Sequence, residues 1–131
     1  MSDKAKLRQK FRELRNQQPG HDDYLFLLEI PEVRDAKVIT SYYPMPGEPS
    51  LITLNDQLVA QGKTLLLPRI TNNQMEFAKY EGALVQRGAF NEPPGNIFIG
   101  EINVVLVPAT AIDHNGNRLG QGGGYYDQFL V

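Results

Sequence analysis

Apolar residues recur at helical spacing near the start of the chain, at Leu7, Phe11 and Leu14. Around them stand six of the thirteen basic residues of the sequence. This pattern predicts an amphipathic helix over residues 1–16, with one face packed and another strongly positive. A break is expected at residues 17–23, where a proline is followed by a glycine.

The next part of the chain predicts a short apolar helix and then a strand, a helix and a strand. The short helix covers residues 24–30, and the first strand is the β-rich segment 37–43. A second helix is expected over residues 50–61, and an apolar strand over residues 64–67 that Pro68 terminates. The second helix is expected to be capped by Ser50, ended by Gly62 and buried along Leu51, Leu54, Leu58 and Val59.

These proportions are typical of a βαβ unit, so the two strands are expected to be parallel with a right-handed crossover. Ligands of such sheets lie beyond the carboxyl ends of the strands. The segments that follow Tyr43, Leu67 and Val107 should therefore share one rim.

The second half of the chain carries weaker signals. Residues 74–80 alternate well enough to predict a strand, and residues 88–100, rich in Gly, Pro and Asn, are interpreted as a loop. Glu92 in that loop either lines the site or caps a turn, and we favour the turn. Residues 102–107 are the most apolar strand, expected to be central and buried on both faces, and residues 113–117 predict a turn.

Composition narrows the class of protein. The chain has 131 residues, of which 41% are hydrophobic, which suits one domain with its own core. A net charge of −2 gives no electrostatic reason to expect nucleic acid or membrane as a partner. There are no cysteines, and no apolar run approaches the ~20 residues of a membrane span. A cytoplasmic protein is the expectation.

Residues 118–130, R-L-G-Q-G-G-G-Y-Y-D-Q-F-L, follow the most apolar strand and lead into a helix start. Glycines let the backbone approach a ligand closely, and amides at a helix N-terminus favour anions. Arg118 offers a forked donor to phosphate oxygens, and Asp127 is a hard oxygen ligand for Mg²⁺. Neither a Walker loop nor the dinucleotide fingerprint fits, since Tyr125 stands where each needs another residue. A nucleoside triphosphate is the predicted guest, and a tight turn without a ligand is the alternative.

The stretch N-G-N-R-L-G-Q-G-G-G-Y-Y-D at residues 115–127 resembles the signature of the 5-formyltetrahydrofolate cyclo-ligases, also called methenyltetrahydrofolate synthetases. Three further pieces resemble that family in the same order, K-A-K-L-R at residues 4–8, Y-Y-P-M-P-G-E at residues 42–48 and the segment from residue 62 to residue 69. The resemblance covers nearly the whole chain. It implies a single domain with a three-layer α/β/α sandwich and a mostly parallel, Rossmann-like sheet.

The resemblance also implies the site residues. Catalytic roles would fall to Lys4, Arg8 and Arg118, and the metal contact to Asp127. ATP would be bound by Lys4, Ala5, Lys6, Leu7, Arg8, Arg118, Leu119, Gly120, Gln121, Gly122, Gly123, Gly124, Tyr125 and Tyr126. The folate substrate would be bound by Met45, Ser50, Gln121, Gly122, Gly123, Gly124 and Tyr125. Glu48 is added to this set because the shared rim of the sheet would turn it toward the glycine segment. Ser50 departs from the acidic or amide residue expected there, and Pro49 from a β-branched one.

Lys4 and Arg8 stand one turn apart on the predicted N-terminal helix. In the family the matching residues bind ATP, which brings them to the glycine segment. A solvated basic face is an equally weighted interpretation, because most charge runs are only that. Binding of RNA phosphates is a third and weaker one, without aromatic stacking residues to support it.

In the family's reaction, the formyl oxygen of 5-formyltetrahydrofolate takes the γ-phosphoryl group of ATP, the activated carbon closes onto a neighbouring amine, and phosphate leaves. The product is 5,10-methenyltetrahydrofolate. Positioning and charge neutralisation by Mg²⁺, cationic side chains and amides suffice for such a step. A catalytic His or Cys is not required.

The sequence ends soon after the glycine signature, whereas family members continue for several tens of residues and add a second acidic residue at the metal site. Two interpretations follow: an ATP-dependent cyclo-ligase, or a truncated relative that binds nucleotide or folate without turnover. The expected partners are ATP, 5-formyltetrahydrofolate and Mg²⁺. The protein is expected to be a monomer, or to self-associate through an exposed sheet edge.

Overall fold

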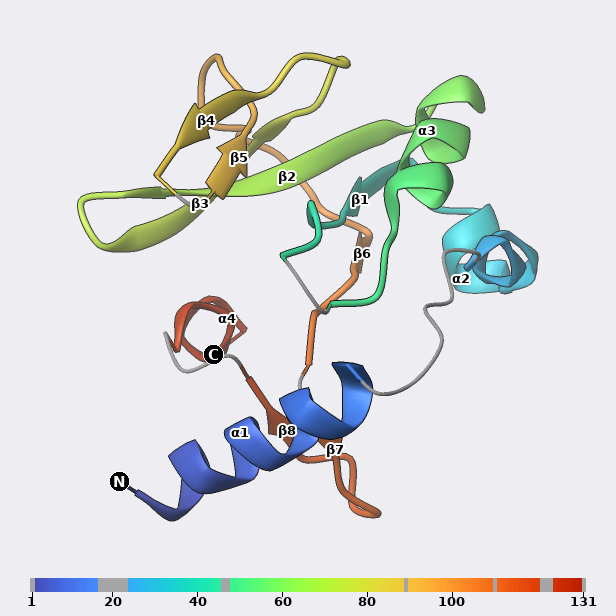
Figure 1. Ribbon diagram of the computed structural model, residues 1–131. Helices are drawn as coiled ribbons and strands as arrows, with labels where there is room; N and C mark the ends of the chain where they lie inside the picture. The colour runs from blue at the N-terminus through green and yellow to red at the C-terminus, as the bar shows by residue number, and fades with distance from the viewer. Residues whose placement is uncertain are drawn as a thin grey trace.

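The computed structural model of the chain describes residues 2–16, 24–45, 48–88, 90–109, 111–120 and 124–130. The predicted break at residues 17–23 lies outside them. A four-stranded sheet in the order β3-β2-β1-β6 forms the centre of the molecule (Figure 1). Its strands are β1 (Val38–Thr40), β2 (Thr64–Thr71), β3 (Gln74–Lys79) and β6 (Val104–Val105). β1 pairs in parallel with β2 and β6, and β2 pairs antiparallel with β3, which confirms the parallel βαβ unit.

Helices occupy the four predicted helical segments, and one further short helix was not predicted. They are α1 (Asp3–Asn16), α3 (Ile52–Ala60), α4 (Tyr125–Phe129), a 3₁₀ helix η1 (Leu25–Glu29) and a short α2 (Pro31–Arg34). The N-terminal helix is confirmed, but its expected packed face is not, because Leu7 and Leu14 are 44% and 43% exposed. The short apolar helix ends before Pro31 as expected, and Pro31 then begins α2, because at the first helical position its fixed φ suits the helix and its missing N–H costs nothing. None of these helices has the length and apolar character needed to cross a bilayer.

Two small hairpins accompany the sheet. One pairs β4 (Val85–Arg87) with β5 (Phe90–Glu92), so the interpretation of residues 88–100 as a loop was wrong at its start. The other pairs β7 (Ala111–Ile112) with β8 (Arg118–Leu119) across the predicted turn at residues 113–117. Asp113 Oδ1 fixes that turn by accepting the N–H groups of Asn115 at 2.9 Å and Asn117 at 2.8 Å.

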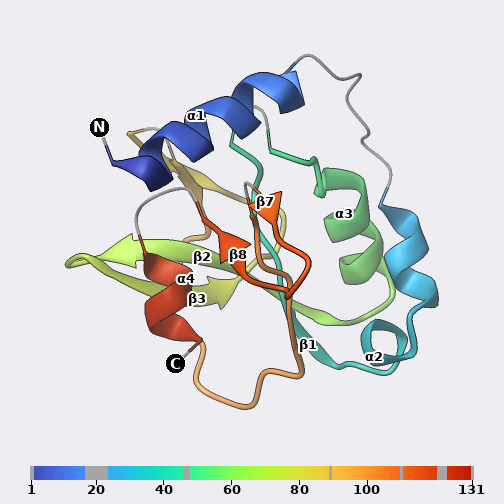
Figure 2. The ribbon, with the colours of Figure 1, turned by 90° about the horizontal axis from the view of Figure 1, so that it is seen from below.

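Helices lie on both faces of the sheet. Leu65 and Tyr80 pack with Leu54 and Leu58 of α3. Phe77 lies on β3, three residues before Tyr80, and faces the other way, since its ring centre lies 4.8 Å from that of Phe129 in α4. Figure 2 shows α1, α4 and the β7–β8 hairpin in front of the sheet on that side. The α/β/α layering is thereby confirmed.

Pro68 does not end β2, which runs on to Thr71 and pairs with β3 throughout. The N–H of Ser41 donates to the Leu66 carbonyl at 2.9 Å, so Leu66 and every second residue after it turn their backbone groups toward the β1 side. β1 stops at Thr40, before it reaches Pro68. The missing N–H therefore costs no ladder bond, which is the condition under which a strand tolerates proline.

Two other expectations about the sheet were wrong. β1 has three residues in place of the seven predicted. β6 has two, lies at the border of the sheet and is half-buried, where a central strand buried on both faces was expected. An apolar strand is expected to be buried, but its composition does not show which strands lie beside it. The apolar run at residues 102–107 therefore did not predict its position in the strand order of the sheet.

The helix after β1 begins later than predicted, and Ser50 makes no capping hydrogen bond to it. Leu51, Leu54 and Leu58 are buried as expected, but Val59 is 39% exposed. Asn55 takes the remaining core position, at 4% exposure. Its Oδ1 accepts the Ser41 hydroxyl at 2.6 Å and its Nδ2 donates to the Tyr42 carbonyl at 3.2 Å, so α3 holds the chain that leaves β1.

Leu58→Ala and Val59→Ala give a direct test of this orientation of α3. Leu58 is fully buried, so its truncation is expected to lower the free energy of unfolding by about 2–5 kcal/mol. Val59 is more exposed, so Val59→Ala is expected to lower the free energy of unfolding by well under half as much. Urea denaturation of both variants checks the ratio, and equal losses would contradict the orientation.

Candidate active site

A cavity of about 990 Å³ opens where the parallel strands end. The chain that follows β1, the far half of β2 and the segment around the second hairpin all contribute to it, which confirms the shared rim. The described residues that line it are Arg8, Arg12, Tyr42, Tyr43, Pro44, Met45, Glu48, Ser50, Pro68, Arg69, Ile70, Met75, Phe90, Asn91, Glu92, Pro108, Arg118, Gly120, Gly124, Tyr125, Tyr126 and Asp127.

The N-terminal helix reaches this cavity through Arg8. The guanidinium Nε of Arg8 donates to the carbonyl oxygen of Gly120 at 2.9 Å, a contact between residues 112 positions apart. Arg12, one helical turn further on, lines the cavity as well. Sequence reasoning did not select Arg12, although its i+4 spacing from Arg8 was a usable signal.

The other N-terminal candidates lie away from the cavity wall. Lys4, Lys6 and Leu7 are exposed and Ala5 is half-buried, and none of the four is among the described residues that line the cavity. Their contact with ATP stays a prediction.

Arg118 is held in place from several sides. Its Nη1 donates to the Pro108 carbonyl at 3.0 Å, its Nη2 donates to Asp127 Oδ1 at 2.7 Å, and its Cζ lies 5.8 Å from the centre of the Tyr126 ring. A Cβ on Gly120 would stand 2.8 Å from Nη1, so a side chain there would push the guanidinium away. Arg118 is 17% exposed, and the forked donor is thus fixed in advance at the cavity wall.

The glycine segment is described at its two ends. Leu119 is half-buried in β8 and is not among the lining residues, whereas Gly120 is. Gly124 has φ +72° in the left-handed region, which favours glycine, and precedes α4 with Tyr125 at its start. Gln121, Gly122 and Gly123, predicted to bind both ATP and folate, lie outside the described residues.

The hydroxyl of Tyr126 is buried and has no hydrogen-bond partner within the described part of the chain. Burial, and then the nearby Glu48 carboxylate, hold the pKa of this phenol well above its ordinary value. Tyr126 therefore keeps its proton at neutral pH. It offers the cavity a donor that the described residues leave unused.

The chain after β1 forms the opposite wall. The Met45 N–H donates to Glu48 Oε1 at 2.7 Å, and the Glu48 N–H returns a bond to the Met45 carbonyl at 3.0 Å. This closed pair holds the Glu48 side chain against the Met45 backbone, and both residues line the cavity with Tyr42, Tyr43 and Ser50. Met45, Glu48 and Ser50, the three predicted folate contacts here, therefore stand together at the cavity.

Glu92 corrects one interpretation, because it does not cap a turn. It belongs to β5, is only 4% exposed and lines the cavity. Its Oε2 accepts the N–H of Ile70 at 2.8 Å. Sequence reasoning had no signal for this contact, which depends on where β1 ends.

Asp127 stands at the lip of the cavity with 72% of its side chain exposed. One carboxylate oxygen is paired with Arg118, and the other has no partner in the part of the chain that the structure describes. Among the described residues, no group of three or more His, Cys, Asp or Glu side chains gathers at one point. A single carboxylate is enough for Mg²⁺ that is carried mainly by substrate phosphates, so the predicted metal contact is chemically consistent with this site.

Replacing Arg8 by Gln tests the junction between the two ends of the chain. Loss of the charge-assisted bond to Gly120 is expected to lower the free energy of unfolding by about 1–2 kcal/mol. Lys6→Gln makes the same change of charge at an exposed position of the same helix and is expected to cost much less. Thermal unfolding compares the two, and an equal effect would mean that the Arg8 contact adds nothing beyond charge.

Comparisons with known proteins agree with this arrangement. The model of the 5-formyltetrahydrofolate cyclo-ligase family matches residues 1–131. A 5-formyltetrahydrofolate cyclo-ligase of Mycolicibacterium smegmatis is 36% identical over 107 residues, which cover 72% of this chain and 55% of the relative. The enzyme of the same name from Haemophilus influenzae is 34% identical over 113 residues, covering 79% of this chain and 60% of the relative.

A solved structure is similar as well. The NMR structure of the Aquifex aeolicus 5,10-methenyltetrahydrofolate synthetase has a TM-score of 0.81 and 28% sequence identity, with 97% of this chain and 71% of that chain covered. The present chain spans somewhat more than half the length of the two bacterial relatives described above. On the full-length family match and the shared fold, the chain belongs to the 5-formyltetrahydrofolate cyclo-ligase family.

Proposed function

We propose that the protein converts 5-formyltetrahydrofolate to 5,10-methenyltetrahydrofolate with ATP and Mg²⁺, releasing ADP and phosphate. The observation that carries the proposal is the contact of Arg8 with Gly120, which brings a basic helix to the glycine segment at one cavity. Family membership and relatives named 5-formyltetrahydrofolate cyclo-ligase support it.

The triphosphate of ATP would lie on the side of the cavity where cations and a free donor are found. Arg8 and Arg118 are fixed there by carbonyl oxygens, Arg12 adds a third guanidinium, and Tyr126 adds its hydroxyl. Because these groups are already ordered, they would neutralise developing charge on phosphoryl oxygens without reorganising. Lys4 and the amides of residues 120–124 are proposed to complete the set.

The folate would lie against the wall formed by the chain after β1. Tyr42, Tyr43 and Met45 offer aromatic and thioether surface to a flat ring, and Glu48 and Ser50 offer polar contacts. A volume of about 990 Å³ lies at the upper end of the range of small-molecule sites, which suits two substrates held together.

The chemistry needs two displacements. The formyl oxygen attacks the γ-phosphorus and the bond from that phosphorus to the β–γ bridging oxygen breaks, which leaves ADP. The neighbouring amine nitrogen of the folate then attacks the activated formyl carbon, and the formyl oxygen departs with the phosphoryl group as inorganic phosphate. Arg8 and Arg118 would hold the phosphoryl oxygens in line for the first step.

Asp127 would hold the magnesium ion, which when bound neutralises charge on the phosphate oxygens. Because Asp127 is paired with Arg118, the guanidinium of Arg118 and the metal-binding carboxylate of Asp127 would both lie beside the same phosphate groups. The available oxygen of Asp127 is the atom proposed to face the metal.

The proposed activity is tested by the absorbance of methenyltetrahydrofolate in mixtures of the protein, ATP, Mg²⁺ and 5-formyltetrahydrofolate. Absorbance is expected to rise only when all three ligands are present. Saturable binding of nucleotide or folate by calorimetry with no product would instead establish a non-catalytic relative. Absence of both binding and product would reject the proposal.

Asp127→Asn tests the metal contact, with Asp35→Asn, an exposed carboxylate on the far side of the sheet from α4, as the control. The concentration of Mg²⁺ that gives half-maximal rate is expected to rise at least about 10-fold in the first variant only. If the KM for ATP rises at every magnesium concentration while the half-saturation for Mg²⁺ stays unchanged, Asp127 acts through Arg118 and is not a metal ligand.

A further inference from the structure

Glu92 is an almost fully buried carboxylate at the cavity. Its side chain is 5% exposed, and it is the one ionisable group among the buried polar residues of the described chain. Burying a carboxylate is costly unless its oxygens are well paired. The contacts of the two carboxylate oxygens therefore show whether the fold alone accounts for the burial of Glu92.

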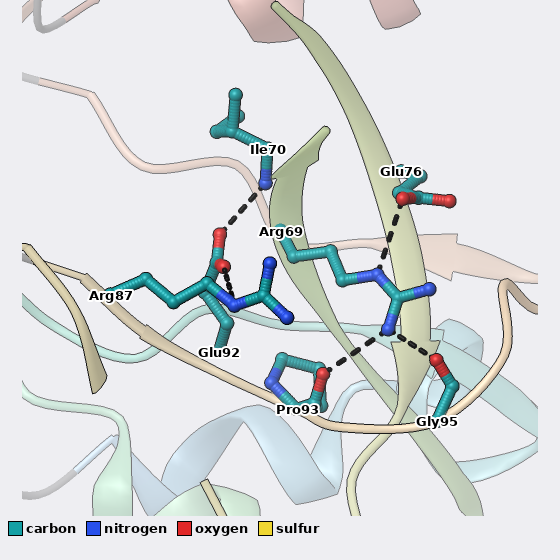
Figure 3. Close-up of polar contacts among 7 residues, drawn as sticks. All are labelled: Arg69, Ile70, Glu76, Arg87, Glu92, Pro93 and Gly95. Atoms are coloured by element: carbon teal, nitrogen blue, oxygen red, sulfur yellow. Dashed lines mark hydrogen bonds and ion pairs between the residues drawn. The ribbon is translucent and has the colours of Figure 1, made fainter. Parts of the chain in front are cut away.

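One oxygen of Glu92 has a structural partner. β2 continues to Thr71 after β1 has stopped at Thr40, so no strand of the described residues pairs with that edge of β2 beyond this point. The N–H of Ile70 faces this gap, and Glu92 Oε2 accepts it at 2.8 Å. Figure 3 shows the Glu92 carboxylate between Ile70 and Arg87. This bond explains an acceptor at position 92, but a neutral amide would supply one as well.

The other oxygen is poorly paired. Oε1 lies 3.6 Å from Nε of Arg87, whose side chain is 64% exposed, so this ion pair is weak. The half-buried guanidinium nearby, that of Arg69, is engaged elsewhere. Its Nε donates to Glu76 Oε1 at 3.2 Å, and its Nη1 donates to the carbonyls of Pro93 and Gly95 (Figure 3). Among the described residues, Glu92 Oε1 thus meets only the distant Arg87 guanidinium and keeps acceptor capacity for a ligand.

The same cavity wall is largely apolar around this group, with Pro68, Ile70, Met75 and Phe90. A flat heteroaromatic ring suits such a wall, and a carboxylate within it selects a ring edge with two adjacent N–H donors, which it accepts in a bidentate manner. The pterin ring has such an edge, formed by its ring N3–H and its 2-amino group. Adenine has no adjacent pair of donors on its ring edge.

We propose that Glu92 is a specificity-determining residue, which accepts the N3–H and 2-amino donors of the pterin and so selects the folate over the nucleotide at this end of the cavity. The proposal rests on the proposed function and extends it to one residue. Substitution by glutamine separates this recognition role from the structural role of Glu92 toward Ile70. Glutamine at position 92 keeps an acceptor for Ile70 but turns an amide N–H₂ toward the ring donors.

Calorimetry with Mg²⁺ and a non-hydrolysable ATP analogue tests this on the whole chain. The titrants are 5-formyltetrahydrofolate and its analogue with hydrogen in place of the 2-amino group. The unaltered protein is expected to bind the parent compound about 10- to 100-fold more tightly than the analogue. Glu92→Gln is expected to weaken the parent by a similar factor and to remove most of the difference between the two compounds.

Controls separate recognition from damage to the fold. Glu81→Gln makes the same chemical change at a carboxylate that is 72% exposed and is expected to behave as the unaltered protein. Affinity for the ATP analogue alone is expected to be the same in all three proteins. Should Glu92→Gln fail to fold, Glu92→Asp, which withdraws the charge by one methylene group, is expected to narrow the same affinity ratio.

Two results would overturn the proposal alone: equal binding of the two compounds by the unaltered protein, or an undiminished affinity ratio in Glu92→Gln. In both cases folate still binds, so the proposed function stands. Failure of the unaltered protein to bind either compound would reject the proposed function, and this proposal with it.

Discussion

The unequal lengths of β1 and β2 are the constraint from which the site follows. β1 leaves the sheet after Thr40, and β2 continues to Thr71. The chain that departs from β1 becomes one wall of the cavity, and the open edge of β2 becomes another. Both exposed backbone edges then need partners, because unpaired buried amides and carbonyls are costly. Asn55 supplies the partner for Tyr42, and Glu92 supplies it for Ile70. The side chains that close the fold at this point are thus the ones that shape the cavity.

The cavity holds four arginines, and three of them are positioned by main-chain carbonyl oxygens. Arg8 bonds Gly120, Arg118 bonds Pro108, and Arg69 bonds Pro93 and Gly95. A carbonyl orients a guanidinium without cancelling its charge, so Arg8 stays available to an anion. Arg69 and Arg118 also meet carboxylates, at Glu76 and Asp127. Arg69 therefore serves the fold, while Arg118 shares its charge between the exposed Asp127 and the cavity.

Much of the architecture could be predicted from the sequence. The βαβ unit, the basic helix and the rim shared by three segments follow from local periodicity and from the handedness of parallel connections. What was missed depends on where strands end relative to one another. A proline usually ends a strand, but β2 continues through Pro68 because β1 has already left the sheet at that point. Glu92 sits in a sequence typical of a turn, and its role becomes visible only once the unpaired edge of β2 beside it is known. Asn55 was passed over because a polar residue in a helical stripe is expected at the surface, and here the departing Ser41 and Tyr42 bury it. Gln121, Gly122 and Gly123 remain predictions, since they lie outside the described residues.

The basic helix is lightly packed for an element that supplies two cavity arginines. Leu7 and Leu14, expected on its packed face, are 44% and 43% exposed, so apolar burial contributes little to its position. The bond from Arg8 to Gly120 is one polar contact that joins α1 to the cavity wall. An anion placed between α1 and Arg118 would add attraction across the same junction, and binding to the folded state alone raises its stability by mass action. A polyphosphate would under this proposal be both a substrate and the element that fastens the N-terminal helix over its own site. Catalytic geometry and the docking of α1 would then depend on the same charges.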